Sequence, residues 1–191
     1  FPAPHFNKLF YQSTDKVVCI SKVTHEILKR VAKDVESEYL PHAVDSEFFK
    51  KFKSEEGVNS IKGMRQNLLN STDAKHFNKD KKIFFWNNRN ARRKQSGTLI
   101  WWFKEFLDEV GHDKACLLMH TDARDPHGQD LPHLIEHLGV GDGQVFLSTN
   151  KVAPQDLAAM YNAADFTLNI SDAEGFGLAT LESMACGTPI I

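Results

Sequence analysis

Short apolar runs and amphipathic stretches alternate along the second half of the chain. Four apolar runs predict buried strands, at residues 83–86, 115–119, 144–147 and 166–170. Apolar positions spaced three to four residues apart predict a helix after each strand, at residues 98–110, 130–138, 155–162 and 178–185. Residues 189–191 begin a further strand. This alternation is typical of right-handed βαβ units, and it predicts an α/β fold with a parallel sheet and flanking helices.

The first part of the chain is less regular. Residues 16–20 and 38–40 predict two short strands, and a helix runs between them from Ser21 to about Val35. Pro41 and the residues after it break the pattern and predict a linker at 41–45. Residues 50–82 are rich in Lys, Asn, Ser and Asp, which indicates solvated loops around one short helix at 61–69. We therefore expect three parts, residues 1–40, 41–81 and 82–191.

The predicted helix at 98–110 carries an apolar stripe that is rich in aromatic residues. Aromatic stripes at helical spacing are far more often core than cofactor contacts, so we expect these side chains to pack inside the domain. The stripe consists of Leu99, Trp102, Phe103, Phe106 and Leu107.

Composition places the chain among globular proteins and argues against one class of partner. Hydrophobic residues make up 41% and charged residues 25%, and the net charge is -2, which argues against nucleic acid as a partner. The chain has three cysteines, an odd number, and each lies in an apolar stretch. Disulfide bonds are therefore not expected, which favours a reducing compartment. Neither a signal peptide nor an apolar run of about 18 residues is present. These features predict a cytoplasmic protein and leave peripheral membrane association open.

The ends of the sequence suggest a fragment. The chain begins at Phe1 without methionine and stops at Ile191, inside a predicted strand. We expect apolar surface to be exposed by truncation at both ends, which favours self-association.

Two polar clusters follow strands of the predicted sheet. The first, residues 87–94, contains three arginines and Lys94, and the second runs from Glu174 to Glu182. Glycine disfavours helix, so Gly175 and Gly177 indicate that Glu174 lies in a loop, whereas Glu182 projects from the helix that follows. Ligands of open parallel sheets bind beyond the carboxyl ends of the strands. Two clusters at such positions predict one binding site.

The residue types in the two clusters indicate a phosphate-containing ligand with a polyhydroxylated part. Arg89 and Lys94 can neutralise an anion, and the helix beginning near Gly177 would direct free N–H groups at it. Carboxylates accept hydrogen bonds from hydroxyl groups, so Glu182 suits a ribose diol and Glu174 a sugar hydroxyl. Each cluster alone is also compatible with a solvated loop or a charged helix face, and only their combination favours a site.

The same residues carry a family resemblance. The run E-G-F-G-L-A-T-L-E at 174–182, followed by S-M-A-C-G-T-P-I-I, resembles the E-x7-E signature of retaining glycosyltransferases of family 4, which have the GT-B fold. R-N-A-R-R-K at 89–94 resembles the phosphate-binding Arg/Lys pair of that family, and Y-N-A-A-D at 161–165 resembles the segment before its donor-site strand. The resemblance implies that 82–191 is a Rossmann-like donor-binding domain, incomplete at its C-terminus, and that 1–40 is a remnant of the acceptor domain.

The resemblance implies transfer of a sugar from a UDP-, GDP- or ADP-linked donor with retention at the anomeric carbon, without metal or other cofactor. Arg89 and Lys94 would hold the diphosphate and stabilise the leaving group, Glu182 would bind the ribose, and Glu174 would lie near the reacting carbon. The implied catalytic residues are thus Glu174, Arg89 and Lys94. Backbone N–H groups would also contact the sugar and phosphates, from Gly175, Phe176, Gly177, Leu178 and Ala179.

Two other interpretations fit part of the sequence. A non-catalytic nucleotide-sugar-binding module with the GT-B fold would carry the same motifs. His133-Leu-Ile-Glu136-His137 matches an inverted zincin pattern, which needs a third ligand downstream. The glutamates available there are better explained by the other site, so we expect no metal. The nucleotide, the sugar, the acceptor and any general base stay open.

Overall fold

The computed structural model describes residues 4–70 and 76–191. Contacts divide the chain into two compact units. The first contains the residues up to Ala43 together with Gly175–Leu178, and the second contains Val44–Glu174 and Ala179–Ile191. The assignment of the first unit to an acceptor domain stays a prediction.

The first unit contains a two-stranded parallel sheet and a helix between its strands. Strand β1 (Lys16–Cys19) pairs with β2 (Glu36–Tyr39), and α2 (Lys22–Val31) connects them. The side chain of Ser21 caps α2 by accepting a hydrogen bond from the Thr24 N–H. The predicted end of this helix at Val35 is wrong, because the chain must turn after Ala32 to place β2 beside β1. No helix is predicted for the short η1 (Pro4–Asn7) and α1 (Lys8–Gln12), although Phe6, Leu9 and Phe10 have helical spacing.

The second unit is built on a four-stranded parallel sheet, as the alternation predicts. The strand order is β5-β4-β3-β6, and every pair is parallel. The predicted strand at 166–170 shortens to two ladder residues, although the Leu168 N–H still donates to the Phe85 carbonyl at 2.8 Å. The predicted strand at 189–191 is reduced to one bridge, between Ile190 and Thr167. The strands are β3 (Lys82–Asn87), β4 (Ala115–His120), β5 (Val145–Ser148) and β6 (Phe166–Thr167).

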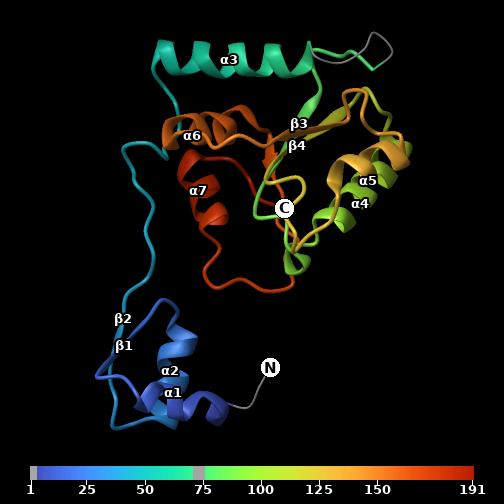
Figure 1. The fold of residues 1–191 in the computed structure, drawn as a ribbon. Helices are drawn as coiled ribbons and strands as arrows, with labels where there is room; N and C mark the ends of the chain where they lie inside the picture. Colours follow the sequence, from blue (N-terminus) through green and yellow to red (C-terminus); the bar gives the residue numbers. More distant parts are fainter. Residues whose placement is uncertain (1–3, 71–75) are drawn as a thin grey trace. The chain divides into compact units, whose positions relative to one another are not determined.

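Helices cover both faces of this sheet (Figure 1). One buried cluster joins α4 and α5 to the sheet through Ile100, Leu117 and Leu131, and a second joins α6 and α7 through Phe85 and Tyr161. This is the doubly covered α/β arrangement in which loops at the carboxyl ends of the strands carry function. The helices are α4 (Ser96–Val110), α5 (Leu131–Leu138), α6 (Pro154–Ala163) and α7 (Leu178–Cys186), with the short η2 (Arg92–Lys94) before α4.

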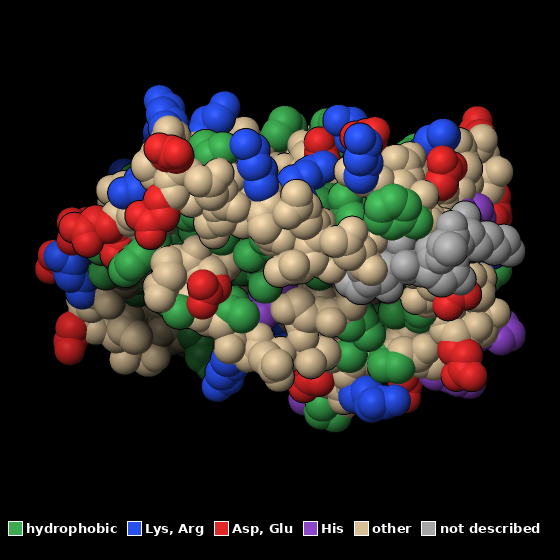
Figure 2. All heavy atoms as spheres, turned by 90° about the horizontal axis from the view of Figure 1, so that it is seen from above, with side chains coloured by type: hydrophobic (Ala, Val, Ile, Leu, Met, Phe, Trp, Pro, Cys, Tyr) green, Lys and Arg blue, Asp and Glu red, His purple; other side chains and the backbone are tan. Residues whose placement is uncertain are grey.

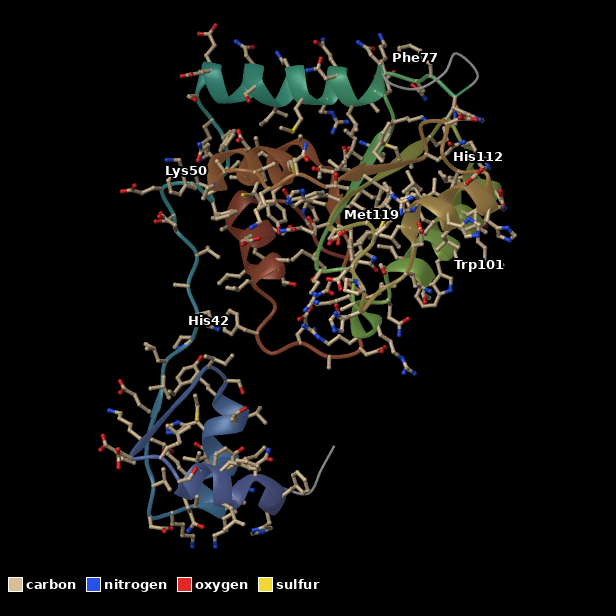
Figure 3. The ribbon with its side chains drawn as sticks, in the orientation of Figure 1. His42, Lys50, Phe77, Trp101, His112 and Met119 are labelled. Carbon is tan, nitrogen blue, oxygen red and sulfur yellow. The ribbon has the colours of Figure 1, made fainter. Side chains whose placement is uncertain are left out.

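The aromatic stripe of α4 is only partly in the core, against expectation. Phe103 is buried, but Trp102 is 55% exposed and Phe106 is 38% exposed. Figure 3 shows the contrast between Trp101, which points outward from α4, and Met119, which points from β4 into the interior. The buried face of α4 is formed by Leu99, Ile100, Phe103 and Leu107, whereas Trp101 and Trp102 lie outside it.

Helix α3 (Glu55–Leu69) is longer than the predicted helix at 61–69. Its polar first turns have no apolar period, but Ser54 caps them by accepting a hydrogen bond from the Gly57 N–H at 3.1 Å. The helix packs against α6 (Figure 1). Arg65 donates to the Asp165 carboxylate at 2.9 Å. The segment 41–81 therefore contains a helix of 15 residues, longer than the predicted one.

Surface charge is mixed on the face that carries α3. Figure 2 shows Lys and Arg side chains interspersed with Asp and Glu there, rather than gathered by sign. In the described part of the chain, no helix has the length and apolar character that crossing a bilayer requires. The three cysteines are buried and unpaired.

Candidate functional site

A pocket opens beyond the carboxyl ends of three neighbouring strands. Its volume is about 410 Å³, and it is lined by residues 87–89 after β3, 120–122 after β4 and 149–151 after β5. The hydroxyl of Thr121 is buried in this wall without a hydrogen-bond partner in the described chain. A buried hydroxyl without a hydrogen-bond partner is uncommon in folded proteins.

Arg89 is a cationic residue of the pocket wall, as is Lys151. Its Nε donates to Asp125 Oδ2 at 2.6 Å, and its Nη2 donates to Asp125 Oδ1 at 3.2 Å. These hydrogen bonds hold the pKa of the Asp125 carboxyl well below its usual range and raise the pKa of Arg89. The guanidinium is therefore charged and fixed in place by a bidentate ion pair with a buried carboxylate.

Lys94 and Glu174 lie together, as their positions after β3 and β6 predict. Lys94 is only 5% exposed, and its Nζ donates to the Glu174 carboxylate and to Asn88 Oδ1, the latter at 2.6 Å. Burial by itself raises the pKa of Glu174, but hydrogen bonds, chiefly from Lys94, outweigh burial and hold it below its usual value. This part of the 87–94 cluster is a partly buried ion pair, in which the ammonium is buried and the carboxylate is more exposed.

The loop that carries Glu174 is attached to the loop after β3 by three further contacts. Arg93 Nη1 donates to the Ala173 carbonyl at 2.7 Å, and the Asp172 N–H donates to the Arg93 carbonyl at 2.9 Å. Gln95 Nε2 donates to both carboxylate oxygens of Asp172, at 2.9 and 2.8 Å. Gln95 has a φ of 57°, so this contact holds a residue in the left-handed region that side chains seldom adopt. Sequence reasoning missed both Gln95 and Asp172.

Glu182 is held by a different pair of residues. The Tyr161 hydroxyl donates to Glu182 Oε2 at 2.7 Å, and Asn87 Nδ2 lies 3.4 Å from the same oxygen. Burial raises the pKa of Glu182, although these hydrogen bonds oppose the rise. Asn87 could be located from the sequence because it follows the predicted strand at 83–86, but no pattern indicates the direction of the Tyr161 hydroxyl.

A further polar contact joins the loops after β3 and β4. Asn90 is fully buried, its Nδ2 donates to the Gln129 carbonyl at 2.7 Å, and its Oδ1 accepts from the Ser96 hydroxyl at 2.6 Å. Gly128 lies so close that a Cβ there would be 2.2 Å from the Asn90 carbonyl oxygen. This contact fixes the two loops that form most of the pocket wall.

The predicted site residues thus fall into separate groups. Arg89 binds Asp125, and no hydrogen bond in the described chain joins it to Lys94 or Glu174. Asn88 and Asn87, which flank Arg89 in the pocket wall, instead reach Lys94 and Glu182. The exit of β3 therefore links the pocket to both carboxylates.

Four of the residues between the two glutamates belong to the first unit by their contacts, and their part in ligand binding stays a prediction. These residues are Gly175, Phe176, Gly177 and Leu178. Within that unit the Phe176 ring packs edge-on against His42, with 5.2 Å between ring centroids. Gly177 has a φ of 85°, a conformation that glycine adopts without strain. Ala179, in the first turn of α7, is partly buried.

The histidine pair on α5 has no metal-site geometry around it. The rings of His133 and His137 stack with 6.5 Å between centroids. Across residues 4–70 and 76–191, no three His, Cys, Asp or Glu side chains gather as metal ligands.

Comparison with known proteins decides the family. The model of the glycosyl transferases group 1 family matches residues 70–191, which is more than half of the chain. The chain belongs to this family. As a group 1 glycosyl transferase, it is 28% identical over 182 residues to alpha-monoglucosyldiacylglycerol synthase of Streptococcus pneumoniae, a match that covers 95% of this chain and 38% of that protein.

Solved glycosyl transferase structures share the fold. Sucrose-phosphate synthase from Thermosynechococcus elongatus matches with a TM-score of 0.69 and 25% identity, covering 96% of this chain and 42% of that one. A pneumococcal O-GlcNAc transferase, solved with UDP and GlcNAc, matches with a TM-score of 0.62 and 14% identity over 97% of this chain and 30% of that one. The predicted relation to GT-B glycosyltransferases is confirmed. The group 1 glycosyl transferase chain spans less than half the length of these relatives.

Proposed function

We propose that this chain supplies the donor-binding part of an enzyme that transfers a sugar from a nucleotide-sugar to an acceptor with retention of anomeric configuration. The family supports sugar transfer in general. The observation that carries the finer proposal is the exit of β3, where Asn87, Asn88 and Arg89 line one pocket and contact Glu182, Lys94 and Asp125.

In this proposal the nucleotide enters the pocket at the ends of β3, β4 and β5. Arg89 lines this pocket and would supply a fixed cation for the diphosphate. Asn87, which also lines the pocket, contacts the Glu182 carboxylate, which would accept the ribose diol. Lys94 has three ammonium protons, and the described residues take two of them. The third is free to bind a phosphate oxygen.

The chemistry would depend on positive charge that is already in place. When the bond between the anomeric carbon and the diphosphate breaks, its electron pair stays on the phosphate oxygen. A guanidinium and an ammonium held by ion pairs stabilise that growing charge without reorganising, which is the most effective form of electrostatic catalysis. Two such cations suit a leaving group that departs without metal. Glu174, held by Lys94, would accept a hydroxyl of the donor sugar close to the reacting carbon.

Calorimetric titration of the purified chain with UDP, GDP and ADP tests the donor site. We expect one of the three to bind, and Arg89→Ala and Lys94→Met each to weaken it about 10- to 100-fold, since a hydrogen bond to a charged group contributes about 1.5–3 kcal/mol. Arg124→Ala is the matched control, because Arg124 pairs with Asp130 outside the pocket. Absence of binding, or equal affinities in all three variants, would refute the proposal.

A second measurement separates an enzyme from a binding module. We expect slow hydrolysis of UDP-glucose, GDP-mannose or ADP-glucose, unaffected by EDTA, with release of the α-sugar first as seen by NMR, and with loss of activity in Glu174→Ala. Binding without hydrolysis or transfer to any acceptor would favour the non-catalytic module.

A further inference from the structure

Glu182 is presented by a buried hydrogen-bond network that the sequence does not reveal. Both donors, the Tyr161 hydroxyl and Asn87 Nδ2, are directed at the same carboxylate oxygen, Oε2, at 2.7 and 3.4 Å. Asn87 also donates to the Tyr161 hydroxyl at 2.9 Å, which closes a triangle of polar groups. In the described chain Oε1 accepts no hydrogen bond, and it is not among the buried atoms that lack a partner. One oxygen is therefore fixed and the other is left for a ligand.

The Tyr161 side chain is itself immobile. It has no exposed surface, and its ring packs edge-on against Phe85, with 5.0 Å between centroids, and against Phe49 at 6.3 Å. Burial raises the pKa of the phenol far above neutrality, so the hydroxyl keeps its proton and donates at every physiological pH. The Tyr161 carbonyl also accepts a hydrogen bond from the Thr188 hydroxyl at 2.6 Å, which ties α6 to the end of α7.

We infer that Tyr161 is a positioning residue, which together with Asn87 fixes Glu182 so that its free oxygen receives a vicinal hydroxyl pair of the bound nucleotide. The inference rests on the proposed function, and it adds a group that acts through Glu182 without touching the ligand. A carboxylate that swings freely would lose rotamer entropy when it binds a diol, whereas one held in place does not. Tyr161 should thus contribute to discrimination between ribose and deoxyribose more than to affinity for phosphate.

Tyr161→Phe tests this, because it removes the hydroxyl and retains the packed ring. The probes are UDP, GDP and ADP, each paired with its 2′-deoxy form in calorimetric titrations. We expect the ratio of ribose to deoxyribose affinity to fall at least threefold in Tyr161→Phe. It should stay at the wild-type value in Thr188→Val, which removes a neighbouring buried hydroxyl that does not contact Glu182. An equal loss of affinity for both sugars, or an unchanged ratio, would overturn the inference.

A ligand-free measurement separates this inference from the proposed function. The side-chain carboxyl of Glu182 can be titrated by carbon-13 NMR in the wild type and both variants. Because Tyr161 stabilises the charged carboxylate, its pKa should rise in Tyr161→Phe and not in Thr188→Val. An unchanged titration would overturn the positioning role even if nucleotides bind. A raised pKa in a protein that binds no nucleotide would instead refute the proposed function and with it the diol, while the network itself stands.

Discussion

The ammonium of Lys94 is hydrogen-bonded to the carboxylate of Glu174, which lies 80 residues later in the chain. One residue is proposed to hold the diphosphate and the other the sugar, so each neutralises its partner when no donor is present. A donor that contacts both must share Lys94 with Glu174. Substitution of Glu174 therefore tests whether Lys94 binds the diphosphate and Glu174 binds the sugar.

Glu174→Gln should tighten the binding of a nucleoside diphosphate that lacks the sugar. The substitution removes the negative charge next to Lys94, and we expect about a fivefold gain, equivalent to ~1 kcal/mol. Binding of the complete nucleotide-sugar should not gain in the same way, because the acceptor of the sugar hydroxyl is weakened. Calorimetry with and without the sugar measures both effects. Asp172→Asn is the control, since that carboxylate is held by Gln95. Weaker nucleotide binding in Glu174→Gln than in the control would contradict the assignment.

Glu182 should reduce the stability of the folded protein at neutral pH. Burial raises its pKa above the ordinary value of 4.5, so the folded state binds this proton more tightly than the unfolded state. The stabilisation from protonation is complete below pH 4.5 and is lost as the pH rises through the folded-state pKa. Glu182→Gln should therefore raise the free energy of unfolding at pH 7.5 by about 0.5–1 kcal/mol, a gain typical of removing a functional constraint.

Urea unfolding at pH 7.5 and at the lowest pH where the protein stays folded measures this dependence. The gain from Glu182→Gln should shrink toward acid pH. Glu136→Gln on the exposed face of α5 serves as the control and should show no such trend. If the free energies of unfolding of the two variants depend on pH in the same way, burial does not destabilise the Glu182 carboxylate.

Two glycines should respond to alanine in opposite directions. At Gly128 a Cβ would lie 2.2 Å from the Asn90 carbonyl oxygen, so Gly128→Ala forces the loop to move and should cost about 1–3 kcal/mol. At Gly63, inside α3, nothing lies within 4 Å of the added Cβ, and Gly63→Ala should stabilise by about 0.5–1 kcal/mol. The urea concentrations at the unfolding midpoints of the two variants measure these effects. If both midpoints shift in the same direction, the close approach at Gly128 does not make alanine destabilising there.

The strands could be predicted because their signals are local. Runs such as 83–86 and 115–119 are continuously apolar, and β3 and β4 extend them by only one or two residues. Helix α3 was underestimated because its first turns are marked by a capping serine and two glutamates rather than by an apolar period. The exposure of Trp102 was missed because periodicity identifies a helix face but not how much of it the neighbouring elements cover.

The candidate site was predictable only as far as strand ends could locate it. The position of Lys94 beside Glu174 follows from the rule that parallel strands bring their carboxyl ends to one edge. The pairing of Arg89 with Asp125 does not, because it depends on the path of the loop after β4, which carries no periodic signal. Tyr161 lies on a helix whose pattern says only that the residue is inside, and nothing in it indicates that the hydroxyl reaches Glu182.

The contacts at the exit of β3 join residues that are far apart along the chain. Asn87 meets Glu182 across 95 positions, and Lys94 meets Glu174 across 80. Such contacts form only after β6 has docked beside β3, and chain connectivity makes such long-range docking slow. Since these contacts form part of the proposed donor site, we expect nucleotide binding to appear late in folding. Nucleotide at 100 times its dissociation constant would bind only the folded state and stabilise it by about 2.7 kcal/mol. Recovery of nucleotide binding would therefore report the last steps of refolding.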